Sequence, residues 1–365
     1  MDPLYPAILL LYGVILAGIS PVYLGMALFQ RERYQSALRC FLWLHKLAPL
    51  LPQWRGPAAN YLAACYTQLG EYELAQSYAE EAVEENSKRN HPKFLLSSQM
   101  YLGVLLSRQG HYAQAEKLFD EALSAPMSQP ALRRWVEVHA ANTYILRGRY
   151  EDAERLLLGV LTEKQSRPDL LAGAHCILGI CCYLKNDLAA ALENTRLARE
   201  IPRTSGWANV MALSGMLLYL AEMGDVEQGR RIEAELRPLL AGAPTHLHQR
   251  ALLAIGGLAL AVNDLDRARD YADRAARADA NPNGQAAALL IQAEVFAARQ
   301  NRHRAMTLCD VILQSNTIDF YKAKAESLRQ KLMEPIAQTA IANRYQTVQA
   351  GDEISVTPEL RVQPW

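Results

Sequence analysis

The sequence predicts an all-α fold: an α-solenoid of about eight helical hairpins in one continuous chain. A short phrase of small residues, an aromatic residue and alanine recurs along the 365 residues, as QLGEYELAQSYAEEAV at 68–83 and RQGHYAQAEKLFDEAL at 108–123. The copies follow one another at a nearly constant spacing. Alanine and leucine, which favour helices, dominate a composition that is 50% hydrophobic and only 8% aromatic.

The residue that follows the turn of each phrase gives the period of the repeat. Successive positions lie 38, 40, 38, 38, 38, 39 and 38 residues apart, a length that suits one helix–turn–helix unit. The eight positions are Tyr34, Tyr72, Tyr112, Tyr150, Leu188, Val226, Leu265 and, less clearly, His303. We expect each unit to stack on the next and so bury its apolar face.

Small residues recur at fixed places within each unit. Three positions after the repeat residue stand Ala37, Ala75, Ala115, Ala153, Ala191, Gly229 and Ala268. Small side chains at this place let the two helices of a hairpin approach closely. Two positions before the repeat residue stand Gly70, Gly110, Gly148, Asn186, Gly224 and Asn263. Glycine and asparagine tolerate the left-handed conformation that ends a helix, so each pattern predicts a turn between two helices.

The first thirty residues differ from the rest of the chain. No charged side chain lies between Pro3 and Phe29, and this run is long enough for the roughly 20 apolar residues of a membrane-spanning helix. A cleaved signal peptide would carry Lys or Arg before its apolar part, where only Asp2 stands. We therefore expect a transmembrane anchor over residues 1–29, in contact with the membrane through residues 4–29. The alternative is a buried first helix of a soluble protein.

The anchor and the repeat share residues, since the first repeat unit begins near residue 20. We expect one helix, kinked at Pro21, that leaves the membrane near Arg31 and merges into the solenoid. The basic residues that follow the apolar run resist translocation. The prediction is thus a single-pass protein of the bacterial inner (cytoplasmic) membrane, with its solenoid on the cytoplasmic side.

The repeat resembles the tetratricopeptide repeat (TPR). Residues 99–126 carry the family's pattern best, and the matching positions are Leu102, Gly103, Gly110, Tyr112, Ala115, Phe119, Ala122 and Pro126. The spacing here exceeds the family's usual shorter repeat, and the eighth unit aligns only after one residue is dropped. The expected organisation is a TPR-like solenoid over 20–315, a capping helix over 316–334 and an extended or flexible tail over 335–365.

The resemblance implies that the first helix of each hairpin lines a concave surface. The partner-binding groove is then predicted to include Asn60, Met100, Val104, Trp135, Val138, Asn142, Ile145, Ile180, Tyr183 and Leu218. Members of the family that clamp a terminal carboxylate use lysine and asparagine there, whereas this set is mostly apolar. Its occupant could be a helix of a partner or the chain's own C-terminal segment, or these residues could bury against neighbouring units. Trp365 is either a disordered end or an anchor of the tail in a partner.

Other classes of function find no support in the residues. The 38 basic and 38 acidic side chains balance, which does not favour nucleic acid as a partner. No catalytic motif, phosphate loop or dinucleotide fingerprint is present in the sequence, so we expect no enzyme and no cofactor. Cys176, Cys181 and Cys182 share a predicted helix with His175 but face different sides of it, so we expect reduced core thiols and no metal.

Two functional classes remain. The first is a membrane-anchored scaffold for protein–protein interaction, or an assembly subunit of a membrane protein complex, that binds partner helices or peptides in an apolar groove. The second is a transient receptor or chaperone for peptides or secreted clients. A permanent subunit should co-purify with its complex in fixed proportion, whereas a transient receptor should emerge alone or with a mixture of clients.

Overall fold

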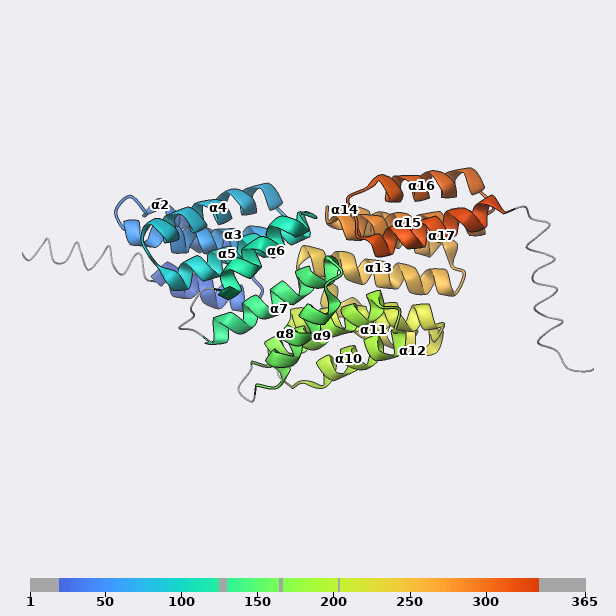
Figure 1. Ribbon diagram of the computed structural model, residues 1–365, viewed down its shortest axis with the longest axis horizontal. Coiled ribbons are helices and arrows are strands. Elements are labelled where there is room, and N and C mark those ends of the chain that lie inside the picture. Colours follow the sequence, from blue (N-terminus) through green and yellow to red (C-terminus); the bar gives the residue numbers. More distant parts are fainter. Residues whose placement is uncertain (1–19, 125–129, 164–166, 203, 335–365) are drawn as a thin grey trace, which may run out of the picture.

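The computed structural model describes residues 20–124, 130–163, 167–202 and 204–334. Within these ranges the chain forms eight stacked helical hairpins, termed units 1 to 8, followed by one further helix (Figure 1). The units comprise residues 20–30 with α2 (Tyr34–Lys46), α3 (Arg55–Leu69) with α4 (Tyr72–Lys88), α5 (Pro92–Arg108) with α6 (Tyr112–Ser124), α7 (Pro130–Leu146) with α8 (Tyr150–Leu161), α9 (Pro168–Leu184) with α10 (Leu188–Glu200), α11 (Gly206–Met223) with α12 (Val226–Leu236), α13 (Thr245–Ala261) with α14 (Leu265–Ala278), and α15 (Pro282–Ala298) with α16 (Arg302–Gln314). The all-α solenoid predicted from the sequence is thereby confirmed.

The two helices of each unit occupy different layers. The first helix of each unit contacts the first helix of the next, from α3 with α5 through to α13 with α15. We term these the inner helices and their hairpin partners the outer helices. Two short 3-10 turns, Pro52–Trp54 and Arg237–Gly242, lie in the connections, and α17 (Asp319–Met333) packs on α15 and α16 after unit 8. The capping helix expected over 316–334 corresponds to α17.

The predicted repeat positions coincide with the starts of the outer helices. Seven of these helices, from α2 to α14, begin at the aligned residues from Tyr34 to Leu265. Unit 8 differs, because α16 begins at Arg302, one residue before the aligned His303. The residue with positive φ in its turn is Gln300, which stands three positions before His303 and not two. This one-residue offset explains why the eighth phrase aligns only after a residue is dropped.

Turn chemistry ends each inner helix and starts each outer one. Gly70 has a φ of +80°, and the backbone N–H of Glu71 then donates to the carbonyl of Tyr66 at 3.0 Å. Asn186 and Asn263 adopt the same left-handed conformation in units 5 and 7. These geometries satisfy carbonyl groups that an α-helix leaves unpaired at its C-terminus.

Small residues set the distance between helices within a unit, as the alanine pattern predicts. Ala115 is fully buried, and on the facing inner helix a Cβ atom added to Gly103 would lie 2.8 Å from the Phe119 ring. The glycine therefore makes space for a fully buried aromatic side chain, and any larger residue would push the helices of unit 3 apart.

Unit 1 corrects the predicted membrane anchor. The helix at residues 20–30 packs on α2 and α3, where Val22 is buried with Leu44 and Ala58, and a Cβ atom on Gly25 would lie 2.7 Å from the Phe41 ring. Hairpin packing accounts for the apolar character of this half of the run, and residues 4–19 lie outside the described residues. Among the helices that the structure describes, none combines the length and apolarity needed to cross a bilayer. The predicted single-pass location in the inner membrane is therefore wrong.

The solenoid curls so tightly that each of the first three units contacts the unit five places further along the chain. In units 1 and 6, the backbone N–H of Trp207 donates to the Glu32 carboxylate at 3.0 Å. In units 2 and 7, the Thr245 hydroxyl donates to the carbonyl of Gln68 at 3.3 Å. In units 3 and 8, the Asn281 amide donates to the carbonyl of Arg108 at 2.7 Å. We term this line of contacts, between turns of the first units and inner-helix starts of the later ones, the seam.

The seam contains a buried polar contact. The hydroxyl of Tyr72 donates to both carboxylate oxygens of Asp279 at 2.8 Å, across 207 residues of sequence. Both side chains are buried, and burial raises the pKa of Tyr72, with Asp279 adding to the shift. The hydrogen bond offsets the desolvation of the carboxylate, so the two turns of the superhelix are held together at a defined register.

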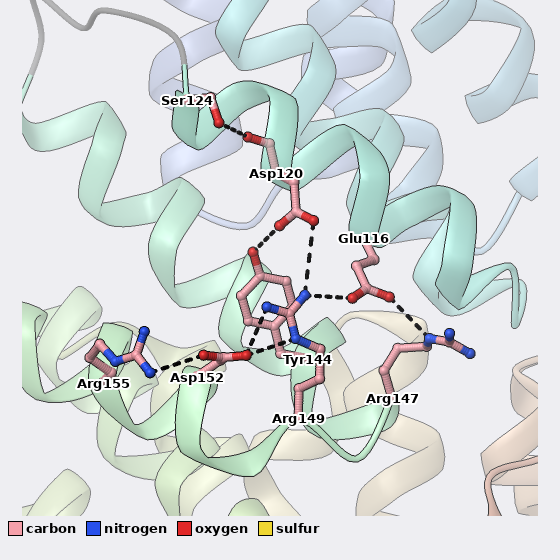
Figure 2. Close-up of polar contacts among 8 residues, drawn as sticks. All are labelled: Glu116, Asp120, Ser124, Tyr144, Arg147, Arg149, Asp152 and Arg155. Atoms are coloured by element: carbon pink, nitrogen blue, oxygen red, sulfur yellow. Dashed lines mark hydrogen bonds and ion pairs between the residues drawn. The ribbon is translucent and has the colours of Figure 1, made fainter.

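Polar contacts also link neighbouring units on the outer side (Figure 2). Arg149, directly before α8, donates to Glu116 at 2.5 Å and to Asp152 at 2.7 Å. Its guanidinium lies 4.2 Å from the centre of the Tyr144 ring, and the Tyr144 hydroxyl donates to Asp120. One arginine thus joins α6, α7 and α8 through charge and ring contacts.

Candidate partner-binding inner face

The ten residues predicted to line a groove all lie on inner helices, α3, α5, α7, α9 and α11. The structure divides them into two sets. The buried set comprises Asn60, Met100, Val138, Ile145 and Tyr183. The set that keeps part of its surface comprises Val104, Trp135, Asn142, Ile180 and Leu218. The role of all ten in binding a partner stays a prediction, and the predicted tail anchor Trp365 lies outside the described residues.

Tyr183 illustrates why an inner-helix residue becomes buried. Its hydroxyl donates to Glu222 on α11 at 2.5 Å, and its ring centre lies 5.0 Å from that of Phe320 on α17. Lys324 of α17 then reaches the Tyr183 hydroxyl at 3.1 Å and pairs with Glu222 at 2.6 Å. Helix α17 therefore covers this end of the inner face, and Tyr183 is one of the residues on which α17 packs.

An aromatic cluster remains partly exposed near the middle of the inner face. The rings of Trp135 on α7 and Trp207 on α11 have centres 6.4 Å apart, although units 4 and 6 are not neighbours. Trp135 also stacks on His139, one helical turn along, with ring centres 6.1 Å apart. The unit between them carries Gly173, where an added Cβ would lie 3.6 Å from the Trp207 ring.

A cluster of cationic and imidazole groups adjoins the aromatic cluster. Arg108, at the end of α5, donates to the carbonyl of Thr67 at 3.1 Å and lies 3.1 Å from Nε2 of His246 on α13. Burial and the charge of Arg108 lower the pKa of His139 to about 4. Burial and the charges of Arg108 and Arg250 hold the pKa of His246 well below its ordinary value. Both imidazoles are thus neutral at pH 7 in a region of positive potential.

Sequence reasoning missed Arg108, His139, Trp207, His246 and Arg250. The reason is geometric, because Arg108 and His246 lie 138 residues apart and meet only where the solenoid closes. A signal was nevertheless present in the sequence. Arg250 is the single Lys, Arg, Asp or Glu in α13, THLHQRALLAIGGLALA, and a lone charge on an apolar inner helix indicates a polar environment there. Among the described residues, no group of three or more His, Cys, Asp or Glu side chains is placed to hold a metal.

Comparisons with known proteins agree with this architecture. A tetratricopeptide repeat family model matches residues 54–126, which cover units 2 and 3. No curated protein matches the sequence. The fold is similar to that in the crystal structure of the APC/C hetero-tetramer Cut9–Hcn1, with a TM-score of 0.58 and 12% identity over 86% of this chain and 55% of that one. It is also similar to the apo form of the quorum sensor NprR from B. thuringiensis, with a TM-score of 0.52 and 16% identity over 70% of this chain and 74% of that one.

At these identities the two solved structures establish a common fold and nothing about ligands. This chain spans just over half the length of the Cut9–Hcn1 chain that it matches, 55% of it. The predicted resemblance to the tetratricopeptide repeat is supported by the family match in units 2 and 3 and by the TPR-like arrangement of the remaining hairpins.

Proposed function

We propose that this chain is a protein–protein interaction scaffold that binds an extended segment of a partner on its inner face. The observation that supports the proposal best is the partly exposed pair Trp135 and Trp207, which two non-neighbouring units bring together. Tryptophan is enriched among the residues that carry most of the energy of protein interfaces, because it buries a large rigid surface at low entropic cost.

The dimensions of the inner face favour a thin occupant. Inner helices four units apart already touch, as Arg108 of α5 does with His246 of α13, and Phe320 of α17 packs on Tyr183 of α9. A folded domain cannot enter between helices whose side chains are in contact, whereas an extended peptide presents one residue at a time. The proposal therefore concerns a short segment of a partner and not a docked domain.

The same narrow face would suit a free peptide, so a transient peptide receptor is the second candidate. The fold-level likeness to NprR, a quorum sensor by the name of its structure, makes this candidate worth testing but supplies only an analogy. Purification distinguishes the two candidates. A scaffold should retain a partner in fixed proportion through gel filtration, whereas a receptor should lose its ligand on dilution.

A charge placed at the tryptophan pair tests the proposal. Trp135→Asp should abolish binding, since a carboxylate next to Trp207 would be desolvated by any occupant. Leu158→Asp is the matched control, because Leu158 lies on the outer helix of the same unit and is 55% exposed. The measurement is quantitative affinity purification of each variant from cells that express it, after circular dichroism shows that both are folded. Partners that persist with Trp135→Asp would exclude the tryptophan pair as the binding site.

A further inference from the structure

Two arginines of the inner face lack the carboxylate partners that Arg134 and Arg267 have. Arg134 pairs with Glu137 at 2.6 Å, and Arg267 pairs with the buried Glu233. Arg250 and Arg108, in contrast, have no carboxylate within ion-pair distance among the described residues, although neither is fully exposed. A charge that is partly removed from water without a counter-charge destabilises the fold, so its retention indicates a role outside folding.

The acidic groups nearest to this region have other partners. The Asp279 carboxylate accepts from the Tyr72 hydroxyl and from the backbone N–H of Asn281. Glu222 pairs with Lys324, and the Glu32 carboxylate accepts from the backbone N–H of Trp207 at 3.0 Å. None of these three carboxylates forms an ion pair with Arg250 or Arg108 among the described residues.

The contact between Arg108 and His246 fixes the tautomer of the imidazole. An arginine can only donate, so Nε2 of His246 accepts from it at 3.1 Å and carries no proton. The proton of the neutral ring is then on Nδ1, which is buried and has no acceptor. His246 thus holds a buried donor that no group of the described residues accepts.

A second and a third unused donor lie beside it. His246 and Arg250 are four residues apart on α13 and therefore share a face, and the Nε–H of Arg250 is also buried without an acceptor. The hydroxyl of Tyr219 on α11 is buried beside Arg250. Burial raises the pKa of Tyr219 to about 12, while the charge of Arg250 and its hydrogen bond to this oxygen oppose the rise, and the hydroxyl proton has no acceptor. Three donors without acceptors in one place are unusual, because buried polar groups in folded proteins are nearly always paired.

Arg250 lies against the part of α11 that carries Gly215. A Cβ atom added to Gly215 would lie 3.5 Å from Nη2 of Arg250, an ordinary contact distance. Arg250 and His246 keep part of their surface exposed, whereas Tyr219 is fully buried. A ligand reaches the two α13 side chains from the inner face, and Tyr219 can contribute only from behind them.

We propose that Arg250, Arg108 and His246 form an anion site on the inner face, which binds the carboxylate of an acidic residue within the partner segment. This inference rests on the proposed function and adds the chemistry of the segment. Arg250 supplies the charge and the forked donors that match a carboxylate, Arg108 supplies a second charge, and the Nδ1–H of His246 becomes available once the ligand displaces the side chains that cover it.

His139 connects the tryptophan pair with the anion site. Its ring stacks on Trp135, with ring centres 6.1 Å apart, and the charge of Arg108 lowers the pKa of the same imidazole. We therefore expect one segment to place an apolar residue on Trp135 and Trp207 and an acidic residue at the arginines.

Selection from a random peptide library tests the proposal and requires no identified partner. The library displays twelve-residue peptides on phage, fused at their C-termini so that no free terminal carboxylate is present, and is selected on the full chain and on its Arg250→Gln and Leu158→Asp variants. We expect the full chain and Leu158→Asp to enrich peptides that pair an apolar residue with Asp or Glu. Arg250→Gln should lose the acidic preference.

Affinity measurements complete the test. An enriched peptide, synthesised with an amidated C-terminus, should bind the full chain 10- to 100-fold more tightly than its Glu→Gln counterpart, and this ratio should fall to about one in Arg250→Gln, as expected for one charge-assisted contact of roughly 1.4 to 2.8 kcal/mol. Arg250→Lys should keep part of the preference. Thermal melting checks the fold, and Arg250→Gln should melt no lower than the full chain, since it removes an uncompensated charge.

The outcomes separate the two proposals. Enriched peptides without acidic residues, or an unchanged preference in Arg250→Gln, would overturn the anion site and leave the peptide-binding function standing. Enrichment of no peptide at all would overturn both. An acidic preference that appears only in a second library with free C-termini would assign the site to a terminal carboxylate and overturn the acidic side chain as its ligand.

Discussion

The inner and outer helices of the solenoid differ in how many charged residues they carry and in how much of their surface is buried. Inner helix α11 has a single charged side chain, Glu222, and buries most of its length, including Leu213, Leu217 and Leu220. Half of the residues of outer helix α14, LDRARDYADRAARA, are charged, and it buries only Ala268, Tyr271, Ala272 and Ala275. The cause is the number of neighbours, because α11 packs on α9, α10, α12 and α13, whereas α14 packs on α13 and α15.

This difference changes how apolar residues on a solenoid should be interpreted. An apolar inner helix first reflects contacts with its own hairpin, with its neighbours and, in a tightly curled chain, with the next turn of the superhelix. Met100 and Ile145 are apolar because they are buried in the core, and they need no partner to account for them. The informative residues on such a helix are the partly exposed aromatic and charged ones, here Trp135 and Arg250.

The largest contrast between the layers should appear on truncation of leucine. Leu217 on α11 is fully buried, so Leu217→Ala should lower the free energy of unfolding by about 2–5 kcal/mol. Leu158 on the outer helix α8 is 55% exposed, and Leu158→Ala should change the free energy of unfolding by less than about 0.5 kcal/mol. Urea unfolding followed by circular dichroism measures both. Equal losses for the two variants would contradict the layered description.

The seam should show a smaller but distinct effect. Tyr72→Phe removes the hydroxyl that donates to Asp279 and leaves a buried carboxylate with one donor fewer, at a cost of about 1–3 kcal/mol. Tyr66→Phe is the matched control, since Tyr66 contacts its surroundings through its ring, which stacks on Tyr78. Hydrogen exchange should show faster opening of α3 and α13 together in Tyr72→Phe, and exchange confined to unit 2 would argue against the seam as a structural contact.

The inner face should also give stability a pH dependence. His139 has a pKa of about 4 in the folded chain, below its ordinary value near 6.5, so the unfolded chain binds more protons between these two pH values. The stability that a neutral His139 contributes is present above pH 6.5 and is lost as pH falls towards 4, by at most about 1.4 kcal/mol per pH unit. His139→Asn should reduce the slope of the unfolding free energy over this window and leave the part that His246 contributes, while His303→Asn, at an exposed site, should leave the slope unchanged.

The smallest effect is expected on the outer surface. Arg149→Ala removes contacts to Glu116, Asp152 and the Tyr144 ring, and because Arg149 is 38% exposed we expect a loss of about 1 kcal/mol or less. Lys117→Ala, at an 81% exposed side chain, should have no measurable effect. Added salt should reduce the difference between these two variants, and a loss above about 3 kcal/mol for Arg149→Ala would place this arginine among the core contacts.

The sequence predicted the units well because the relevant forces are local. Each turn residue, such as Gly70 or Asn186, and the alanine five residues later belong to one hairpin. The structure has both where the pattern predicts them. The membrane anchor was predicted from apolar length alone, and Val22 and Gly25 show that packing on α2 and α3 uses the same residue types. The inner-face cluster could not be predicted, since the pitch of the superhelix decides which units meet.

The seam has a consequence for how the chain is made. In an open solenoid each repeat needs only its neighbours, so stability accumulates unit by unit. Here Glu32 in unit 1 contacts Trp207, and Tyr72 in unit 2 contacts Asp279. Both of these partners are synthesised well over a hundred residues after the residues that they contact. During synthesis the early units therefore exist without their second-turn contacts, and a chain shortened after unit 5 would lose contacts from units that are themselves intact.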